Sequence, residues 1–145
     1  MATLRDSPYG NANFVVEIDG IASSAFTDVR LPDSTIDLKE YRTGTDKVNA
    51  ATKLPGLAHF GNVVLTRGFN GNLDLYAWWK SVLNGNAGDV RTISIVLHDE
   101  ARRPVVRWNI AAAFPVRYAC SDLAANGCEV LAETVECACQ GVEVE

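Results

Sequence analysis

Residues 41–80 read YRTGTDKVNAATKLPGLAHFGNVVLTRGFNGNLDLYAWWK, and the rest of the fold is built outward from this stretch. It begins with about twenty residues that show neither helical nor strand periodicity, which is long for a loop inside a compact domain. A β-rich segment from Asn62 to Arg67 follows and ends at Gly68. Because loops of that length usually carry a function, we expect the unpatterned part to make specific contacts.

The end of the same stretch predicts a helix over about residues 72–84. Asn72 can cap its amino terminus, and Asp74 suits the positive end of the helix dipole. An apolar stripe at positions i, i+3, i+4 and i+7 consists of Leu75, Trp78, Trp79 and Val82. We expect this stripe to pack on a sheet, with Trp79 as the core ring whose replacement tests the packing.

Turn signals and alternating segments on both sides of this stretch predict a mainly β protein. A hairpin is expected around Asp19-Gly20, a second one around residues 99–103 and a third around residues 122–127. The predicted strands are 13–18, 21–26, 35–41, 62–67, 91–98, 104–110, 115–121 and 129–138. Within 35–41, Ile36 and Leu38 lie on one face, and the other face is more polar and is expected to contact solvent. Residues 129–138 also fit a helical stripe, which periodicity alone does not settle, and the choice of a strand there rests on a family resemblance.

The predicted fold class is an antiparallel β-sandwich or partly open β-barrel with one lateral α-helix and a long assembly loop. The chain has 145 residues, of which 48% are hydrophobic, so we expect one domain over residues 1–145. A net charge of −5 disfavours a general nucleic-acid binder, whose surface needs excess lysine and arginine. No signal peptide or apolar span is recognised, so we expect synthesis in the cytoplasm and no membrane insertion.

Four cysteines lie in the last 26 residues, at positions Cys120, Cys128, Cys137 and Cys139. If Cys128 and Cys137 lie on one extended strand, roughly 30 Å separates them, too far for one shared zinc. We therefore expect reduced, partly buried thiols and neither a metal site nor a cofactor.

The residues that catalysis would need do not form a recognisable pattern. The histidines are His59 in the unpatterned stretch and His98 at the end of a strand, and no Gly-x-Ser-x-Gly motif is present. The glycines at 85 and 88 follow a helix, whereas phosphate-binding glycines precede one. We expect no catalytic residues and no enzymatic activity.

Residues 41–80 resemble the tail tube protein family of contractile phage tails and related contractile injection systems. The resemblance continues at Pro8-Tyr9 with residues 13–20, at residues 95–100 with 107–109, and at residues 113–118. Its coverage is nearly end to end. No single motif is specific, but their order and spacing make chance resemblance a poor explanation.

The resemblance implies a structural subunit of an inner tube. Such subunits form hexameric rings that stack into a hollow conduit for DNA or effector protein, inside a sheath and between baseplate and tail-terminator proteins. The mature form would then reside in an assembled phage tail or contractile injection particle. A phage tail, a headless tail and an injection system all remain open.

The unpatterned stretch contains spaced apolar residues, which a disordered linker usually lacks. We therefore predict that residues 43–61 fold over a neighbouring subunit. The candidate subunit-interface residues are Tyr41, Arg42, Asp46, Lys53, Leu54, Pro55 and Leu57, and the possible sheath contacts are Asp74 and Lys80. The alternative function is a small monomeric β-scaffold that binds a ligand or a protein.

Overall fold

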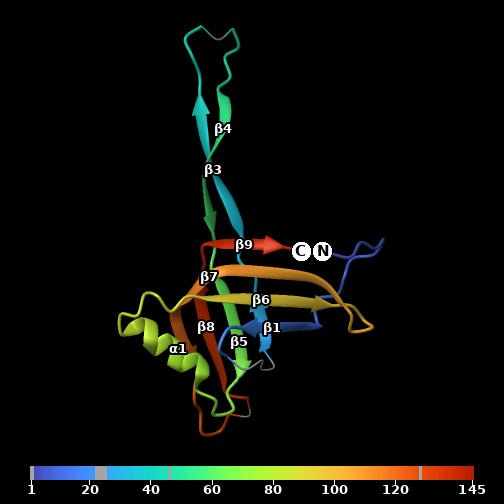
Figure 1. Ribbon diagram of the computed structural model, residues 1–145, viewed down its shortest axis with the longest axis vertical. Helices are drawn as coiled ribbons and strands as arrows, with labels where there is room; N and C mark the ends of the chain where they lie inside the picture. Colours follow the sequence, from blue (N-terminus) through green and yellow to red (C-terminus); the bar gives the residue numbers. More distant parts are fainter. Residues whose placement is uncertain (1, 22–25, 46, 128) are drawn as a thin grey trace.

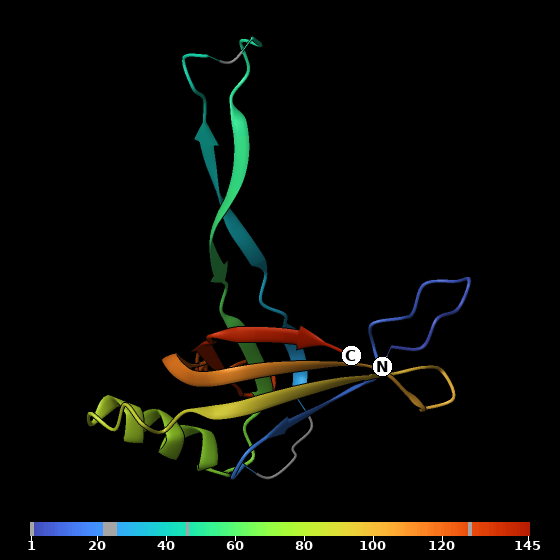
Figure 2. The ribbon, with the colours of Figure 1, turned by 45° about the horizontal axis from the view of Figure 1, so that its top comes forward.

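The computed structural model describes residues 2–21, 26–45, 47–127 and 129–145. Figures 1 and 2 show a body made of crossing strands with one helix beside it, and a long two-stranded projection that leaves the body at one end. Within the described residues the elements are β1 (Phe14–Ile18), β2 (Phe26–Arg30), β3 (Ser34–Tyr41), β4 (Thr52–Phe60), β5 (Val63–Gly68), α1 (Asp74–Leu83), β6 (Arg91–His98), β7 (Pro104–Cys120), β8 (Ala132–Ala138) and β9 (Gly141–Val144).

The long strand β7 joins the two halves of the body. Its first part pairs with β6 and β9, and its second part pairs with β8, which gives the antiparallel order β1-β6-β7-β8-β5-β2 with β9 beside β7. Between these parts Ala112 has a φ of 53°, and the register against β6 shifts between Arg91 and Ile93. A bulge of this kind bends a strand, so one strand serves both halves. The predicted break between residues 110 and 115 is therefore wrong.

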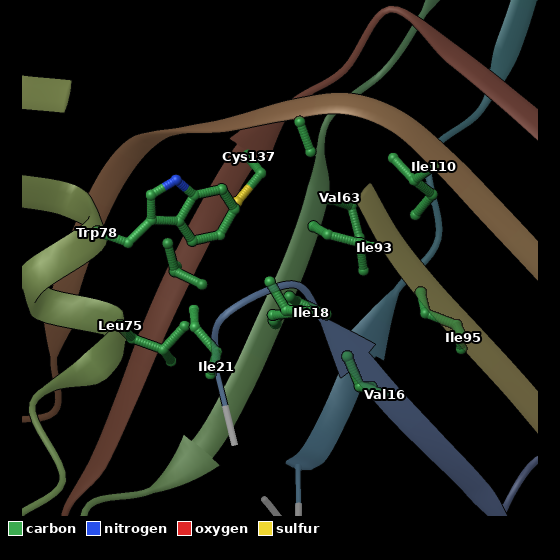
Figure 3. Packing of buried hydrophobic residues seen from close by; sticks show 13 residues of the cluster. Val16, Ile18, Ile21, Val63, Leu75, Trp78, Ile93, Ile95, Ile110 and Cys137 are labelled. Carbon is green, nitrogen blue, oxygen red and sulfur yellow. The ribbon is translucent and has the colours of Figure 1, made fainter. Parts of the chain in front are cut away.

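The hydrophobic core lies between the two halves of this bent sheet. Alternation along β5 and β8 turns Val63, Leu65, Val135 and Cys137 inward, toward Val16, Ile93, Ile95 and Ile110 of the other half. Figure 3 shows the labelled members of this cluster, Val63 and Cys137 among them, facing those of the other half, with Leu75 and Trp78 entering from α1. The order ends at β1 on one side and β2 on the other, so the sheet is not a closed barrel. The mainly β, antiparallel prediction with one lateral helix is confirmed.

Helix α1 spans Asp74–Leu83, two residues shorter at its start than predicted. Leu73 is the N-cap residue and makes no side-chain cap bond, whereas the Asn72 side chain accepts a hydrogen bond from the amide of Asp74 at 3.2 Å. Trp78 is fully buried and Trp79 only partly, so the assignment of Trp79 as the core ring is wrong. Among the described residues no helix has the length and apolarity needed to cross a membrane.

The turn of the hairpin predicted around Asp19-Gly20 is present: Gly20 has a φ of 74°, and among the described residues an antiparallel bridge joins Ile18 to Ile21. Strand β1 pairs with β6, and β2 pairs with β5. The pairing with β6 buries Val16 and Ile18, which stabilises this arrangement. The turn residues alone do not predict that burial. Residues 22–25 of the predicted second strand lie outside the described residues.

The prediction of a strand in the carboxy-terminal part is confirmed for residues 132–138, which pair with both β5 and β7. Strand β9 was not predicted from the sequence. The unpatterned stretch is not a twenty-residue loop, because Thr52–Phe60 forms β4 and pairs with β3. The residues that the structure describes cover neither face of this pair, so no alternation of apolar residues is required, and Pro55 is tolerated on an edge strand.

Candidate functional site

The candidate functional site is the projecting hairpin, which we call the arm and define as residues 34–60. Figures 1 and 2 show it extending away from the body. At its base the Gly61 amide donates to the Asp33 carbonyl at 2.8 Å, so the chain enters and leaves the arm at the same place. The arm is thus a self-contained insertion, and among the described strands its two strands pair only with each other.

Apolar side chains of the arm are exposed on both of its faces. Every residue of β3 is exposed, and Ile36, Leu38 and Leu57 expose 63%, 61% and 69% of their surface. The register places Ile36 opposite Ala58 and Leu38 opposite Pro55, whereas Lys39 opposite Leu54 belongs to the alternate face. A two-stranded hairpin is at best marginally stable in water, so this one needs cover on both faces.

The structure brings most of the predicted interface residues together on the arm. Tyr41, Lys53, Leu54, Pro55 and Leu57 are all exposed on its strands. Their role in an interface stays a prediction, since the structure contains one copy of the chain.

Two further predicted positions lie in the connection between the arm strands. Arg42 donates to the Val48 carbonyl and to Asn49 Oδ1, both at 3.4 Å. Asp46 lies outside the described residues.

Sequence reasoning missed part of the exposed surface of the arm. It placed Ile36 and Leu38 on the drier face of a strand, but the structure exposes both of them. Ile36 and Leu38 alternate with charged residues, as apolar residues do in any strand with one buried face. The local sequence therefore does not show whether that face is covered by the same chain or by a neighbouring subunit.

The two residues predicted to contact a sheath lie on α1 and differ in their surroundings. Lys80 is exposed on the helix. Asp74 is half-buried, and its Oδ1 accepts from Arg67 Nη2 at 2.6 Å and from the Leu75 amide at 2.9 Å. Asp74 therefore has a role within the fold, whereas sheath contact by either residue stays a prediction.

Arg67 is the centre of a buried charged network. Its Nε donates to Glu133 Oε1, and its Nη2 also donates to the Asn72 carbonyl at 3.2 Å. Tyr118 donates to Glu133 Oε2 at 2.6 Å. Burial, and then the hydrogen bond to Glu133, raise the pKa of Tyr118 well above its ordinary value, so the phenol stays protonated as a donor. The network ties β5, β7 and β8 to the start of α1.

The histidines also occupy identifiable surroundings. His59 Nε2 lies 2.9 Å from Asp37 Oδ2 across the two arm strands, and both side chains are more than half exposed. His98 ends β6, and its amide donates to the Asn13 carbonyl at 2.7 Å. Within the part of the chain that the structure describes, no three histidine, cysteine or acidic side chains are grouped so as to hold a metal ion.

Three of the cysteines are described, and they are free thiols in different environments. Cys120 is exposed, Cys139 is intermediate and Cys137 is fully buried. Cys128 lies outside the described residues. Burial first, and then the neighbouring Cys139 and Glu136, raise the pKa of Cys137 to about 12.

We expect these thiols to react with iodoacetamide at very different rates at pH 8. With a pKa of about 12, roughly one Cys137 in ten thousand is a thiolate at that pH, and the thiolate is the nucleophile. Mass spectrometry of the native protein should show Cys120 alkylated first and Cys137 alkylated only after unfolding. Equal rates for the two thiols in native protein would contradict the buried position of Cys137.

The ends of the bent sheet offer further surfaces for contact with other chains. Among the described strands, β1 and β2 each pair with one neighbour in the sheet, and β9 pairs only with β7. Such edges leave one row of backbone amides and carbonyls unpaired, which favours addition of another chain. Open strand edges, together with an arm that exposes apolar side chains on both faces, are typical of a protein that assembles with other chains.

Comparison with known proteins identifies the family. The model of the family described as T4-like virus tail tube protein gp19 matches residues 10–143, nearly the whole chain. The chain therefore belongs to this tail tube protein family and is a structural subunit of a tail tube. No curated protein sequence matches it.

Solved structures share the fold over nearly the full length. A chain in the six-fold symmetrised baseplate of the anti-feeding prophage has a TM-score of 0.81 and 25% identity, with 97% of each chain covered. A chain in the sheath-tube complex of an extracellular contractile injection system, called PVC, has a TM-score of 0.80 and 24% identity, with 95% of this chain and 91% of that chain covered. Hcp1 from Flavobacterium johnsoniae has a TM-score of 0.60 and 13% identity, with 91% and 94% covered.

Proposed function

We propose that this protein is a non-enzymatic inner tube subunit of a contractile tail or injection system, in which rings of six copies stack into a hollow conduit. The observation that carries the proposal is the arm, whose apolar residues are exposed on both faces. One chain leaves this surface in water, at a cost of about 25 cal/mol per Å² of apolar area. Identical neighbours would cover it.

Two kinds of contact are needed, and the molecule offers surfaces for both. Lateral contacts that close a ring must use two different edges of each subunit, and β1, β2 and β9 provide open edges. Axial contacts that stack rings are open-ended and need surfaces at opposite ends of the subunit. The arm lies at one end of the long axis (Figure 1).

The proposed partners follow from the family and from the solved relatives. Similar chains occur in a six-fold symmetrised baseplate, in a sheath-tube complex and in a tube-terminating cap. We propose that this tube likewise lies inside a sheath, between a baseplate and a terminator, and carries DNA or effector protein in its lumen. The subunit would be made in the cytoplasm and would function in the assembled particle.

Removing the arm is expected to abolish tubes while the body stays folded. Since Asp33 and Gly61 already share a backbone hydrogen bond, residues 34–60 can be replaced by Asn-Gly, a two-residue turn. Circular dichroism should report a folded β protein whose melting temperature lies within about 5 °C of the full chain, a shift of order 1 kcal/mol. Negative-stain microscopy should show tubes for the full chain only.

The Ile36→Ser, Leu57→Ser variant keeps the arm but removes two of its exposed apolar side chains, and it should also weaken assembly. A matched control is Leu4→Ser, which removes a 97% exposed leucine outside the arm and should leave assembly unchanged. A full chain that stays monomeric at high concentration would contradict the proposed function and favour the monomeric binding scaffold. An armless variant that still forms tubes would show that assembly does not need the arm.

A further inference from the structure

The end of the molecule opposite the arm has a second unpartnered surface, formed by the connection between β7 and β8. Figure 1 places this connection at the far end of the long axis from the arm tip. We call it the basal loop and define it as the described residues of 121–131. Leu123 and Val130 in it expose 86% and 79% of their surface, so it too leaves apolar side chains in water.

The basal loop is also hollowed. A depression of about 370 Å³ is lined by Asp122, Leu123, Ala124, Gly127, Glu129 and Leu131. The Gly127 amide donates to the Ala124 carbonyl at 3.0 Å, which forms a tight turn at the rim. Polar and apolar groups therefore lie side by side in a concave surface, as in sites that receive a protruding segment.

The charges of the two ends are complementary. Residues 42–53 at the arm tip contain three basic side chains, Arg42, Lys47 and Lys53, and one acidic residue, Asp46. Residues 121–131 contain two acidic side chains, Asp122 and Glu129, and no basic one. In the described part of the chain, none of the three basic side chains of the arm tip forms an ion pair, and neither do the two acidic side chains of the basal loop. The charges of both sets therefore lack an opposite charge within the described chain, since Arg42 donates there only to the neutral Val48 carbonyl and Asn49 side chain.

We propose that the arm tip of one copy docks on the basal loop of the next copy along the tube axis, with Arg42 and Lys47 facing Asp122 and Glu129. This rests on the proposed function and names the surface that receives the arm. The occupant is a second copy of this chain, because its arm supplies the positive charge that the hollow lacks and exposed apolar residues that can cover those of the basal loop. A head-to-tail contact extends into a filament where its rotation does not close a ring, and stacking along the tube axis is of that kind.

Charge reversal tests the pairing in the full chain. The arm variant carries Arg42→Glu and Lys47→Glu, and the basal variant carries Asp122→Lys and Glu129→Lys. Each alone places like charges together, which should raise the critical concentration for tubes at least about tenfold. A chain carrying all four substitutions restores opposite charges, so its tubes should return. Light scattering and negative-stain microscopy report assembly, and circular dichroism checks folding.

Control measurements separate this inference from the function on which it rests. Lys80→Glu reverses an exposed charge on α1 and should leave tube assembly unchanged. A full chain without tubes would overturn the proposed function and the docking with it. If the full chain forms tubes, two results would overturn the docking and leave the proposed function intact. One is normal assembly of the arm variant and the basal variant, and the other is failure of the chain with all four substitutions to form tubes.

Discussion

Replacing Glu133 with alanine is expected to lower the free energy of unfolding by about 3 kcal/mol, because the buried Arg67 loses its buried partner, although it keeps the half-buried Asp74 as an ion-pair partner. Arg67 and Glu133 are 2% and 1% exposed, so water does not replace the lost carboxylate. Tyr118 loses its acceptor in the same substitution. Urea denaturation of the unassembled subunit, followed by circular dichroism, measures the change.

A variant that replaces both Arg67 and Glu133 distinguishes the cost of removing one partner from the value of the pair. Arg67→Met with Glu133→Leu should destabilise less than Glu133→Ala alone, since apolar replacement of a buried pair is often nearly neutral. Glu143→Ala, at an exposed glutamate on β9, is the matched control and should stay within about 0.5 kcal/mol of the parent. A Glu133→Ala variant as stable as that control would rule out the network as a determinant of stability.

Replacing Trp78 with alanine is expected to cost about 3–5 kcal/mol, because it opens a cavity in the centre of the core. The ring is completely buried between α1 and the sheet, as Figure 3 shows. Its Nε1 donates to the Asp89 carbonyl at 3.0 Å, and the Arg91 guanidinium lies 5.1 Å from the ring centroid. Thermal and urea unfolding report the loss, which includes that of the hydrogen bond and the cation–π contact.

The adjacent tryptophan provides an internal control for the same helix. Trp79→Ala removes the same number of atoms from a partly buried position and should cost clearly less than Trp78→Ala. Trp78→Phe keeps an aromatic ring in the core and should recover part of the stability, although the bond to Asp89 is lost. Equal losses for the two alanine variants would mean that α1 packs with a different face than the structure shows.

Much of the body was predictable from local patterns. The β6–β7 hairpin follows from alternation on both sides of a polar turn, and α1 follows from its apolar stripe. The stripe includes both tryptophans, so it left their burial unresolved. Only the rotation of α1 against β7, fixed by packing, makes Trp78 the buried ring.

The buried charges were not predictable for a different reason. Arg67 and Glu133 are 66 residues apart, and each alternates with neighbours as an ordinary strand residue does. Their contact requires that β5 and β8 be paired in one particular register. Pairing over such a distance has no short-range signature, because the register follows from which side chains the whole sheet buries.

The sequence alone was enough to establish the mainly β class, the single lateral helix and the tail tube resemblance, because these depend on residues close together in the chain or on their order. The tertiary fold was needed to establish that β1 pairs with β6, that β7 runs unbroken through both halves and that residues 34–60 form a projecting arm. Each of these results from competition among distant segments for apolar burial and backbone pairing, and a local pattern does not record its outcome.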